Sequence, residues 1–354
     1  MQQPKALIAM SGGVDSSVAA YLTTQEGYSC LGGTMLLYDS GDACGSSAAI
    51  DDARSVAQRL NMPFHVFELT DRFEECVISD FISCYEKGLT PNPCVCCNRH
   101  LKFSAFLDKA KELGCQCMVT GHYAKIRKDE RTGRYLLCKA ADEAKDQSYF
   151  LYAITQEQLA QIRFPLGELT KDQVRAIAQE QGFINAKKRD SQDICFVPNG
   201  DYFAFLRKHT GKEYGQGDFL DTMGNKVGTH HGAAGYTLGQ RKGLGLAMGQ
   251  PVYVCGKDME KNTVTVGPED ALFHKELLAN DWFFFPFPTL TEPMEVEAKT
   301  RSRMAQQPAT VYPEADGYCR VVFHEPQRAI TPGQAVVLYH GDVVVGGGTI
   351  TKVL

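Results

Sequence analysis

A short segment near the start of the chain constrains its fold most. Residues 5–10 (KALIAM) form an apolar run with the length of a buried parallel strand, and SGGVDSSVAAYLTTQEGY follows directly. Gly12 and Gly13 permit a tight turn with close backbone approach. Apolar residues then recur at helical spacing, at Val14, Val18, Ala19 and Leu22. The segment predicts a strand, a glycine-rich loop and a helix.

This loop has the features of an anion-binding site. Backbone amides at a helix N-terminus and the positive end of the helix dipole attract phosphate groups. Hydroxyl groups at Ser11, Ser16 and Ser17 add donors. The loop lacks the GK[ST] ending of the Walker phosphate loop and the spacing of the GxGxxG dinucleotide loop. The simpler alternative is a glycine turn without a ligand, and we favour the phosphate site.

The alternation of strands and helices continues to about residue 205. Expected strands at 30–38, 64–70 and 117–126 alternate with expected helices at 47–61, 73–88 and 103–114. This pattern predicts an α/β fold with a doubly wound parallel sheet. Ligands of such sheets bind at the carboxyl ends of the strands, which places residues 11–17, Met35 and residues 121–122 on one rim. Met35 taken alone is an ordinary strand hydrophobe.

Composition limits the class of protein. The 354 residues suggest two or three domains, and the net charge of -5 gives no overall basic signature, so any RNA contact has to be local. The first residues lack the pattern of a signal peptide, and no apolar run reaches the length of a membrane helix. We therefore expect a cytoplasmic protein that has no membrane contact and keeps its thiols reduced. Most of the 13 cysteines are then small buried hydrophobes.

One stretch concentrates cysteines. TPNPCVCCNRHLKF, residues 90–103, places Cys94, Cys96 and Cys97 within four positions. A metal clip, a disulfide and a catalytic sulfur site all remain open from these residues alone. Zinc would need four tetrahedral ligands, and adjacent cysteines with His100 supply them poorly.

Six blocks in order resemble the tRNA-specific 2-thiouridylases, a family of the PP-loop ATP pyrophosphatase superfamily. They are MSGGVDSSV, TPNPCVCCNRHLKF, TGHYA at 120–124, KDQSYFL at 145–151, SQDICFV at 191–197 and GYTLGQRKGLG at 235–245. The resemblance implies a PP-loop catalytic domain that adenylates the O2 of the wobble uridine in tRNA. Sulfur from a cysteine persulfide then replaces that oxygen, with release of AMP and pyrophosphate.

The resemblance also implies roles for individual residues. Cys97 corresponds to the nucleophile and Cys195 to the persulfide carrier, so a transient disulfide between them is expected. ATP, with Mg²⁺, is expected at Ala9, Met10, Ser11, Gly12, Gly13, Val14, Asp15, Ser16, Met35 and Gly121. The target base is expected at Asn92, Pro93 and Cys94. Further tRNA contacts are expected at Lys145, Asp146, Gln147, Arg301 and Ser302. A cysteine desulfurase or a sulfur-relay protein would supply the sulfur.

The residue chemistry agrees with these roles. Adenylation turns a carbonyl oxygen into a good leaving group, and a thiolate or persulfide is a suitable soft nucleophile. Cations such as Arg99 and Lys102 would favour a deprotonated thiol. Arg189 is a third such cation, and each of them taken singly is more often a solvated surface charge.

The chain departs from the family at Cys94, where the commoner residue is an aspartate proposed as a general acid or base. A thiol has an ordinary pKa of about 8.5, against about 3.9 for aspartate, so that role is in doubt. With Cys97 and Cys195, Cys94 could instead provide three ligands of a [4Fe-4S] cluster that carries the sulfide. We weigh the persulfide relay and the cluster equally, with zinc well behind.

The second half predicts a helix at 169–183 that starts at Thr170 and has Gly182 as its C-cap, and another at 200–211. A β-hairpin is expected at 251–267, and short strands from residue 278 predict a small antiparallel barrel. Within it, Lys299, Arg301 and Arg303 alternate along an expected strand at 294–303 and would form a basic stripe facing RNA. His230 and His231 lack a third metal ligand. We expect domains at 1–204 (PP-loop catalytic), 205–277 (central, RNA-facing) and 278–354 (β-barrel).

Two other functions fit parts of the pattern. A PP-loop ATP-dependent ligase or amidotransferase acting on a small molecule would share the ATP loop but would not need Cys97 and Cys195. A non-catalytic RNA-binding redox sensor would need the cysteines but not ATP cleavage. Assay of wobble-uridine thiolation separates the three.

Overall fold

The computed structural model describes residues 3–38, 46–188 and 194–354. A five-stranded parallel sheet has the order β3-β2-β1-β4-β7. Its strands are β1 (Lys5–Ala9), β2 (Ser29–Leu36), β3 (Phe64–Glu68), β4 (Cys117–Val119) and β7 (Ile162–Arg163). The predicted parallel α/β sheet is confirmed.

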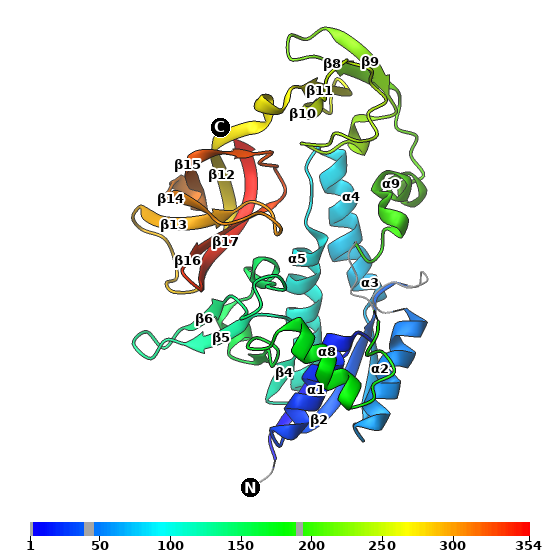
Figure 1. Cartoon of the computed structure of the whole chain (residues 1–354), viewed down its shortest axis with the longest axis vertical. Helices are drawn as coiled ribbons and strands as arrows, with labels where there is room; N and C mark the ends of the chain where they lie inside the picture. The colour runs from blue at the N-terminus through cyan, green and yellow to red at the C-terminus, as the bar shows by residue number, and fades with distance from the viewer. Residues whose placement is uncertain (1–2, 39–45, 189–193) are drawn as a thin grey trace.

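Helices cover both faces of this sheet (Figure 1). One face carries α1 (Val14–Gln25), α2 (Ser47–Arg59) and α8 (Lys171–Glu180), whose apolar residues pack with Ala6 and Ile8 of β1. Leu7 points to the other face and packs with Phe103, Phe106 and Leu107. Alternate residues of β1 therefore serve two separate cores, as expected for a strand buried on both faces.

Two helical segments begin earlier than the sequence predicted. α3 (Thr70–Phe73), a π-helix (Glu74–Ile78) and α4 (Ser79–Glu86) follow one another without a break, as do α5 (Pro93–Cys97), a π-helix (Asn98–Ala105) and α6 (Phe106–Glu112). The second helix begins at Pro93, ten positions before the expected start at residue 103. The sequence signal was Asn92 followed by proline, which is a favourable helix start.

The caps predicted for the helix at 169–183 are confirmed, and so is the second helix. Thr170 caps α8 with a capping box, and Gly182 after it has a φ of 62°. Asp201 caps α9 (Tyr202–Thr210), which ends at Gly211. The remaining short helices are α7 (Gln156–Leu159) and the 3-10 turns Ser148–Leu151, Pro198–Gly200, Ala233–Gly235, Glu269–Leu272 and Ala315–Gly317.

Two β structures follow α9. A four-stranded sheet has the order β10-β11-β8-β9, with strands β8 (Gly217–Leu220), β9 (Lys226–His230), β10 (Tyr253–Asp258) and β11 (Thr263–Gly267). The pairing of β10 with β11 confirms the predicted hairpin. Six antiparallel strands then form a barrel in the order β12-β15-β14-β13-β16-β17, closed by pairing of β12 with β17. The predicted barrel is confirmed.

Barrel strands are β12 (Phe273–Phe284), β13 (Met294–Lys299), β14 (Gln307–Pro313), β15 (Cys319–Arg328), β16 (Ala335–His340) and β17 (Val343–Val353). The sequence missed β12. The expectation that Arg301 and Arg303 lie on a strand was wrong, because β13 ends at Lys299 and the chain then turns, with the amide of Met304 bonded to the carbonyl of Arg301. A shared strand face with Lys299 does not exist.

The expected strand at 117–126 is confirmed at its two ends, but it is not continuous. β4 ends at Val119, and β5 (Lys125–Lys128) pairs with β6 (Tyr135–Cys138) in a hairpin that joins the barrel sheet at β17 (Figure 1). Arg134 reinforces the junction by donating to the carbonyls of Phe284, Phe285 and Phe287. The first half of the chain is thus tied to the barrel, and the domain boundaries at 204 and 277 stay a prediction.

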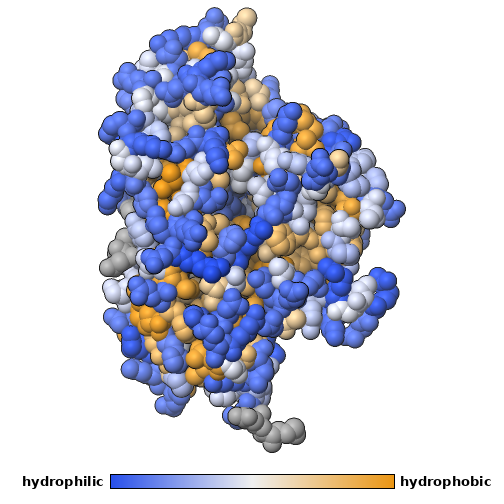
Figure 2. Space-filling model, turned by 180° about the vertical axis from the view of Figure 1, so that it is seen from behind, coloured by the Kyte–Doolittle hydropathy of each residue, from blue (hydrophilic) through white to orange (hydrophobic). Residues whose placement is uncertain are grey.

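Hydrophilic residues cover most of the face in Figure 2, with hydrophobic residues in separate areas between them. No helix in the described ranges is both long and apolar enough to cross a membrane.

Candidate active site

The glycine-rich loop lies where the order of the parallel sheet reverses. β1 is followed in the sheet by β2 on one side and by β4 on the other. Loops that leave adjacent strands in opposite directions at such a point leave a crevice at the strand ends. Residues 10–13, after β1, and residues 120–122, after β4, border this crevice.

Glycine is present at positions 12 and 13 of the loop for different structural reasons. Gly12 has a φ of 72°, and a Cβ placed there would lie 2.3 Å from the carbonyl oxygen of Ala49. Gly13 is the N-cap of α1 with a φ of -94°, and a Cβ there would meet only Ser11 Oγ at 3.4 Å. The fold therefore requires glycine at position 12, whereas at position 13 the protein itself leaves room.

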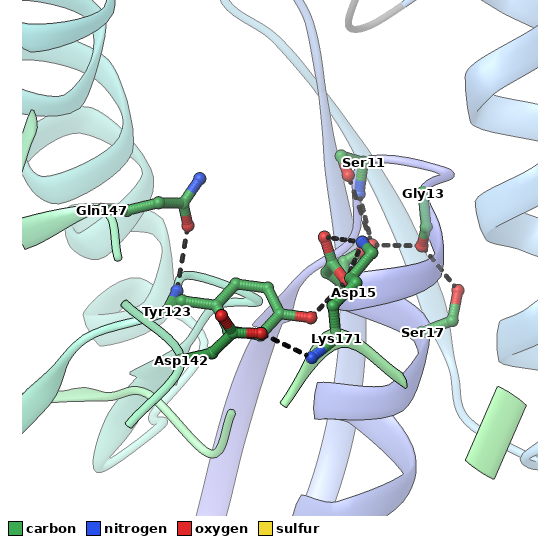
Figure 3. A network of polar contacts seen from close by, with 9 residues as sticks. Ser11, Gly13, Asp15, Ser17, Tyr123, Asp142, Gln147 and Lys171 are labelled. Atoms are coloured by element: carbon green, nitrogen blue, oxygen red, sulfur yellow. Dashed lines mark hydrogen bonds and ion pairs between the residues drawn. The ribbon is translucent and has the colours of Figure 1, made fainter. Parts of the chain in front are cut away.

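Hydroxyl groups hold the loop in shape (Figure 3). Ser16 Oγ donates to the carbonyl of Gly13 at 3.1 Å and accepts from the amide of Ser11 at 3.1 Å. Ser17 Oγ donates to the same carbonyl at 2.9 Å. Asn185, which the sequence did not single out, donates to the carbonyl of Gly12 and to Ser17 Oγ. The loop is thus preorganised before any ligand binds.

Asp15 is the centre of a second set of contacts (Figure 3). Its carboxylate accepts hydrogen bonds from Lys171 Nζ at 2.7 and 2.9 Å and from Tyr123 OH at 2.9 Å. The Lys171 side chain is 8% exposed. Sequence analysis missed Lys171 because it is the first residue of an amphipathic helix, where a lysine is usually solvated.

Asp15 and the glycine-rich loop line a cavity of about 190 Å³. Seven of the expected ATP residues face it, namely Ala9, Met10, Ser11, Asp15, Ser16, Met35 and Gly121. Gly12, Gly13 and Val14 form the turn behind it, and Val14 is buried in the core under α1. Gly121 packs directly on α1, since a Cβ there would lie 2.6 Å from the amide nitrogen of Ser16.

The far wall of the cavity comes from the helix that carries the cysteines. Lys102 of the π-helical segment and Phe106 of α6 face the same cavity as the loop. π-helical turns are rare and occur often at functional sites, because they change which side chains share a face. His122 lies beside them, hydrogen-bonded to Thr120 Oγ1 at 2.8 Å, and burial lowers its pKa well below the ordinary value. It is therefore neutral at pH 7.

The start of the cysteine helix is fixed by the barrel. Gln334 donates to the carbonyls of Thr90 and Pro91, and the amide of Thr90 donates to the carbonyl of Pro332. Asn92 caps the helix by accepting from the amide of Val95 at 3.4 Å. Pro93 is buried and Cys94 is exposed. Of the three expected base contacts, Cys94 presents its side chain most openly.

The neighbouring cysteines differ in environment. Cys96 Sγ donates to the carbonyl of Cys76 at 2.8 Å, and burial raises its pKa to about 12. Its thiol stays protonated at neutral pH. Cys97 is half-buried and packs against a core that includes Phe196 and Val197, which directly follow Cys195. Cys195 itself is exposed.

No disulfide joins the cysteines of the described residues, and the expected Cys97–Cys195 pairing stays a prediction. Within residues 3–38, 46–188 and 194–354, no three or more His, Cys, Asp or Glu side chains lie together as a metal site. That finding concerns sites for a single metal ion, so the assignment of Cys94, Cys97 and Cys195 as cluster ligands stays a prediction. Arg189 and residues 191–193 of the SQDICFV block lie outside the described residues.

The expected tRNA residues at 145–147 form a turn beside the cavity. Asp146 shapes the turn by accepting from the amide of Ala140 at 2.9 Å and from Ser148 Oγ at 2.6 Å. Gln147 lines the cavity, and its Oε1 accepts from the amide of Tyr123 at 2.9 Å. Lys145 lies half-buried in the same turn.

Arg301 lies at a second cavity of about 710 Å³, between α9, residues 237–240 and the barrel. Ser302, the next residue, is half-buried and is not among the residues that line this cavity. Arg301 donates to Thr331 Oγ1 at 2.7 Å and to the carbonyls of Leu238 and Ala329 at 3.4 Å. Its guanidinium thus joins the barrel to the neighbouring loop. Arg303, which the sequence placed with it, is exposed at the same cavity. Arg99 is paired with Asp281 and lies 4.8 Å from the Phe283 ring.

Comparison with known proteins covers the whole chain. Three family profiles match in order: "tRNA methyl transferase HUP domain" at residues 4–199, "tRNA methyl transferase PRC-barrel domain" at 203–268 and "Aminomethyltransferase beta-barrel domain" at 274–350. The tRNA-specific 2-thiouridylase MnmA of Clostridioides difficile (strain 630) is 49% identical over 356 residues, covering 99% of each chain. That of Acetivibrio thermocellus is 49% identical over 358 residues, covering 99% of this chain and all of the relative.

Among solved structures, a 4-thiouridine synthetase–RNA complex with bound ATP is 17% identical, with a TM-score of 0.35 over 59% of this chain and 50% of that one. This likeness is too weak to transfer a ligand or a substrate. Relatives nearly half identical over their full length are decisive, and the chain belongs to the tRNA-specific 2-thiouridylases, a family of tRNA sulfurtransferases.

Proposed function

We propose that the protein catalyses ATP-dependent 2-thiolation of the wobble uridine, position 34, in tRNA. One observation carries the proposal: a single cavity is lined by the glycine-rich loop on one side and by the helix of Cys97 on the other. An ATP site and a thiol on adjoining elements suit a reaction that activates an oxygen and then replaces it with sulfur. A small-molecule ligase would not need that helix.

The first step is adenylation of the base. The O2 of uracil attacks the α-phosphate of ATP, and the bond to the bridging oxygen breaks to release pyrophosphate. The loop amides and the N-terminus of α1 stabilise the charge that develops on the phosphates. Gly13 leaves room for the phosphates to approach the backbone.

Asp15 fits a role in holding Mg²⁺ that arrives with ATP. Its carboxylate lines the cavity, and Mg²⁺ in proteins is bound by one or two carboxylates together with substrate phosphates and water. The metal would supply positive charge that stabilises the departing pyrophosphate. The absence of a three-ligand group among the described residues does not conflict with such a site.

The second step delivers sulfur. The terminal sulfur of a persulfide on Cys195 attacks C2, and AMP leaves with the former uracil oxygen. The Cys97 thiolate then attacks Cys195 Sγ, which breaks the bond to the transferred sulfur and leaves a Cys97–Cys195 disulfide. An external dithiol reduces that disulfide, and a cysteine desulfurase or sulfur-relay protein reloads Cys195. The shared packing of Cys97 and residues 196–197 supports this assignment.

We propose the persulfide route, because Cys97 and the residues that follow Cys195 pack in one hydrophobic core. A [4Fe-4S] cluster held by Cys94, Cys97 and Cys195 is the alternative, and iron and sulfide analysis of anaerobically purified protein distinguishes the two. In the persulfide route the exposed thiol of Cys94 is assigned to the target base.

We assign further tRNA contacts to Lys145, Asp146, Gln147 and Ser302, as the resemblance implies, and we keep the domain boundaries at 204 and 277. For Arg301, which donates to Thr331, Leu238 and Ala329, we propose a structural role instead. Arg303 at the same cavity then takes the tRNA contact.

The test separates the two steps. Cys97→Ser and Cys195→Ser should still release pyrophosphate from ATP on unmodified tRNA, because the ATP loop is intact, but should form no 2-thiouridine. Cys96→Ser is the matched control, because its thiol is buried and protonated. Normal thiolation by both Cys97→Ser and Cys195→Ser would reject the sulfur-transfer mechanism.

A further inference from the structure

Asn185 is buried directly behind the glycine-rich loop. It is 3% exposed, and its Nδ2 donates to the carbonyl of Gly12 at 3.1 Å and to Ser17 Oγ at 2.9 Å. No donor in the described part of the chain reaches its Oδ1. An unpaired buried acceptor is unfavourable, so an asparagine at this position needs an explanation. Its amide donates twice and its oxygen is unused, which indicates that the side chain holds oxygen atoms of the loop.

The hydrogen bonds of Asn185 reach two successive carbonyl groups. The Gly12 carbonyl accepts from it directly. The Gly13 carbonyl accepts from Ser17 Oγ at 2.9 Å (Figure 3), and that hydroxyl is the second acceptor of Asn185. Gly12 and Ser17 are both buried. The two carbonyl groups are therefore fixed on the buried side of the loop.

The direction of these carbonyl groups sets the direction of the next two amides. In a trans peptide the C=O and the following N–H lie in one plane and point opposite ways. The described residues contain no cis peptide bond, so the amides of Gly13 and Val14 point away from the buried side. These amides belong to the N-terminus of α1, where N–H groups have no partner within the helix and attract anions. Gly13 is half-buried and borders Ser11, which lines the cavity.

Building on the proposed use of ATP, we propose that Asn185 is a positioning residue that aims the amides of Gly13 and Val14 at the phosphates. Glycine tolerates both signs of φ, so the peptide between Gly12 and Gly13 has more than one accessible orientation, and Asn185 selects one of them. Amides that are already aimed need no reorganisation when charge develops on the departing pyrophosphate. Asn185 itself touches neither ATP nor the reacting atoms.

The position of Asn185 is fixed by its neighbours in the chain. Phe183 and Ala186 are buried in the core that they share with α1 and α8. The carbonyl of Asn185 accepts from the amide of Lys188 at 2.9 Å, and Lys188 Nζ pairs with Asp52 of α2 at 2.7 Å. A side chain held in this way provides the rigid support that a flexible glycine loop requires.

The first test follows the Gly13 amide directly. Glycine labelled with heavy carbon at the carbonyl and heavy nitrogen at the amide gives NMR signals for Gly–Gly peptides alone, at 12–13, 32–33 and 346–348. When wild type binds inorganic pyrophosphate with Mg²⁺, the amide proton of Gly13 should shift downfield, and the signals of residues 347–348 in β17 should stay. In Asn185→Leu, which has a similar size but no donor, the Gly13 shift should be lost. A Gly13 signal that stays in place in pyrophosphate-bound wild type overturns the proposal.

Binding measurements separate positioning from a general loss of structure. By calorimetry, Asn185→Leu should bind pyrophosphate and a non-hydrolysable ATP analogue roughly 10- to 100-fold more weakly than wild type, the range for loss of a hydrogen bond to a charged group. It should bind adenosine equally well, because adenosine has no phosphate. Equal losses for pyrophosphate and adenosine would show that the variant distorts the whole site, and they overturn the proposal.

Two further variants complete the experiment. Asn185→Gln keeps the amide donors and should recover part of the pyrophosphate affinity, so it tests the proposal if Asn185→Leu fails to fold. Asn262→Ala is the control, since Asn262 also donates to two carbonyls, of Gly215 and Gln216, but beside β11. It should lower the transition temperature and leave pyrophosphate affinity unchanged. If wild type binds no ATP analogue, the proposed function fails as well; normal wild-type binding with unchanged affinity of folded Asn185→Leu overturns only the role of Asn185.

Discussion

The glycines at positions 12 and 13 give the sharpest test of how the ATP loop is built. We predict that Gly12→Ala destabilises the fold, whereas Gly13→Ala leaves it intact and weakens ATP binding. At position 12 the left-handed backbone and the carbonyl of Ala49 at 2.3 Å both oppose a methyl group. At position 13 the backbone is extended, and only Ser11 Oγ at 3.4 Å would touch it.

The size of the effect follows from these contacts. A non-glycine residue in the left-handed region costs about 1–2 kcal/mol, and overpacking against backbone adds about 1–3 kcal/mol. Gly12→Ala should therefore cost roughly 2–5 kcal/mol, which lowers the transition temperature of a domain of this size by about 4–20 °C. Gly13→Ala should stay within about 1 kcal/mol, because a poorer N-cap offsets a less flexible unfolded chain.

Scanning calorimetry and hydrogen exchange of the α1 amides measure stability, and titration with a non-hydrolysable ATP analogue measures binding. Gly215→Ala is the control, because a Cβ there meets nothing within 4 Å. Gly13→Ala should match that control in stability and bind the analogue about tenfold or more weakly. Equal destabilisation by Gly12→Ala and Gly13→Ala, or unchanged ATP affinity of Gly13→Ala, would refute the reasoning.

Three further predictions concern other parts of the molecule. Burial raises the pKa of Cys96 to about 12, so in native protein at pH 8 its thiol should resist iodoacetamide while the exposed Cys195 reacts. Peptide mapping measures both rates, and labelling of Cys96 as fast as Cys195 would contradict its burial. Burial lowers the pKa of Lys257 from 10.5 to about 8, so between these pH values the unfolded chain binds more protons than the folded protein, and the stability of wild type should rise with pH. Denaturant titrations of Lys257→Met should lack this rise. If the variant shows the same dependence of stability on pH as wild type, the charge of Lys257 is not buried. Arg301→Met should lower the transition temperature of the barrel, because three acceptors lose their donor. Arg303→Met should leave stability unchanged and should lower the salt dependence of tRNA binding, the slope of log affinity against log salt concentration, by about 0.7–0.9. The reverse pattern would mean that Arg303 is the structural residue and Arg301 the phosphate contact.

Much of the fold was accessible from sequence because local signals agreed with the global arrangement. Two glycines after an apolar run, a Thr–Gln capping box at Thr170 and hairpin signals around Asn262 each have a local physical cause. β12 was missed because its residues, FHKELLANDWFF, mix strand and helix formers, and its strand form depends on pairing with β15 and β17. The β5–β6 hairpin was missed for the same reason, since the barrel that it joins lies about 200 residues later.

In the candidate site, too, residues with a local sequence signal could be predicted, and residues that depend on distant contacts could not. The loop residues were found because their spacing carries the chemistry, and Met35 and Gly121 came from the resemblance. Lys171 and Asn185 could not be predicted from the sequence, because their contacts with Asp15 and Gly12 join residues more than 150 positions apart. Arg301 was expected to face RNA, and its bonds to Leu238 and Ala329 could be known only once the barrel was placed.

The central claim is that uracil O2 is adenylated and leaves with AMP. The most direct measurement uses tRNA that carries heavy oxygen at O2 of the wobble uridine, with ATP, the persulfide-loaded protein and mass spectrometry of both products. The account predicts that heavy oxygen appears in the released AMP, in an amount equal to the 2-thiouridine formed. Thiolation accompanied by AMP without heavy oxygen, or AMP released without any thiolated tRNA, would contradict it.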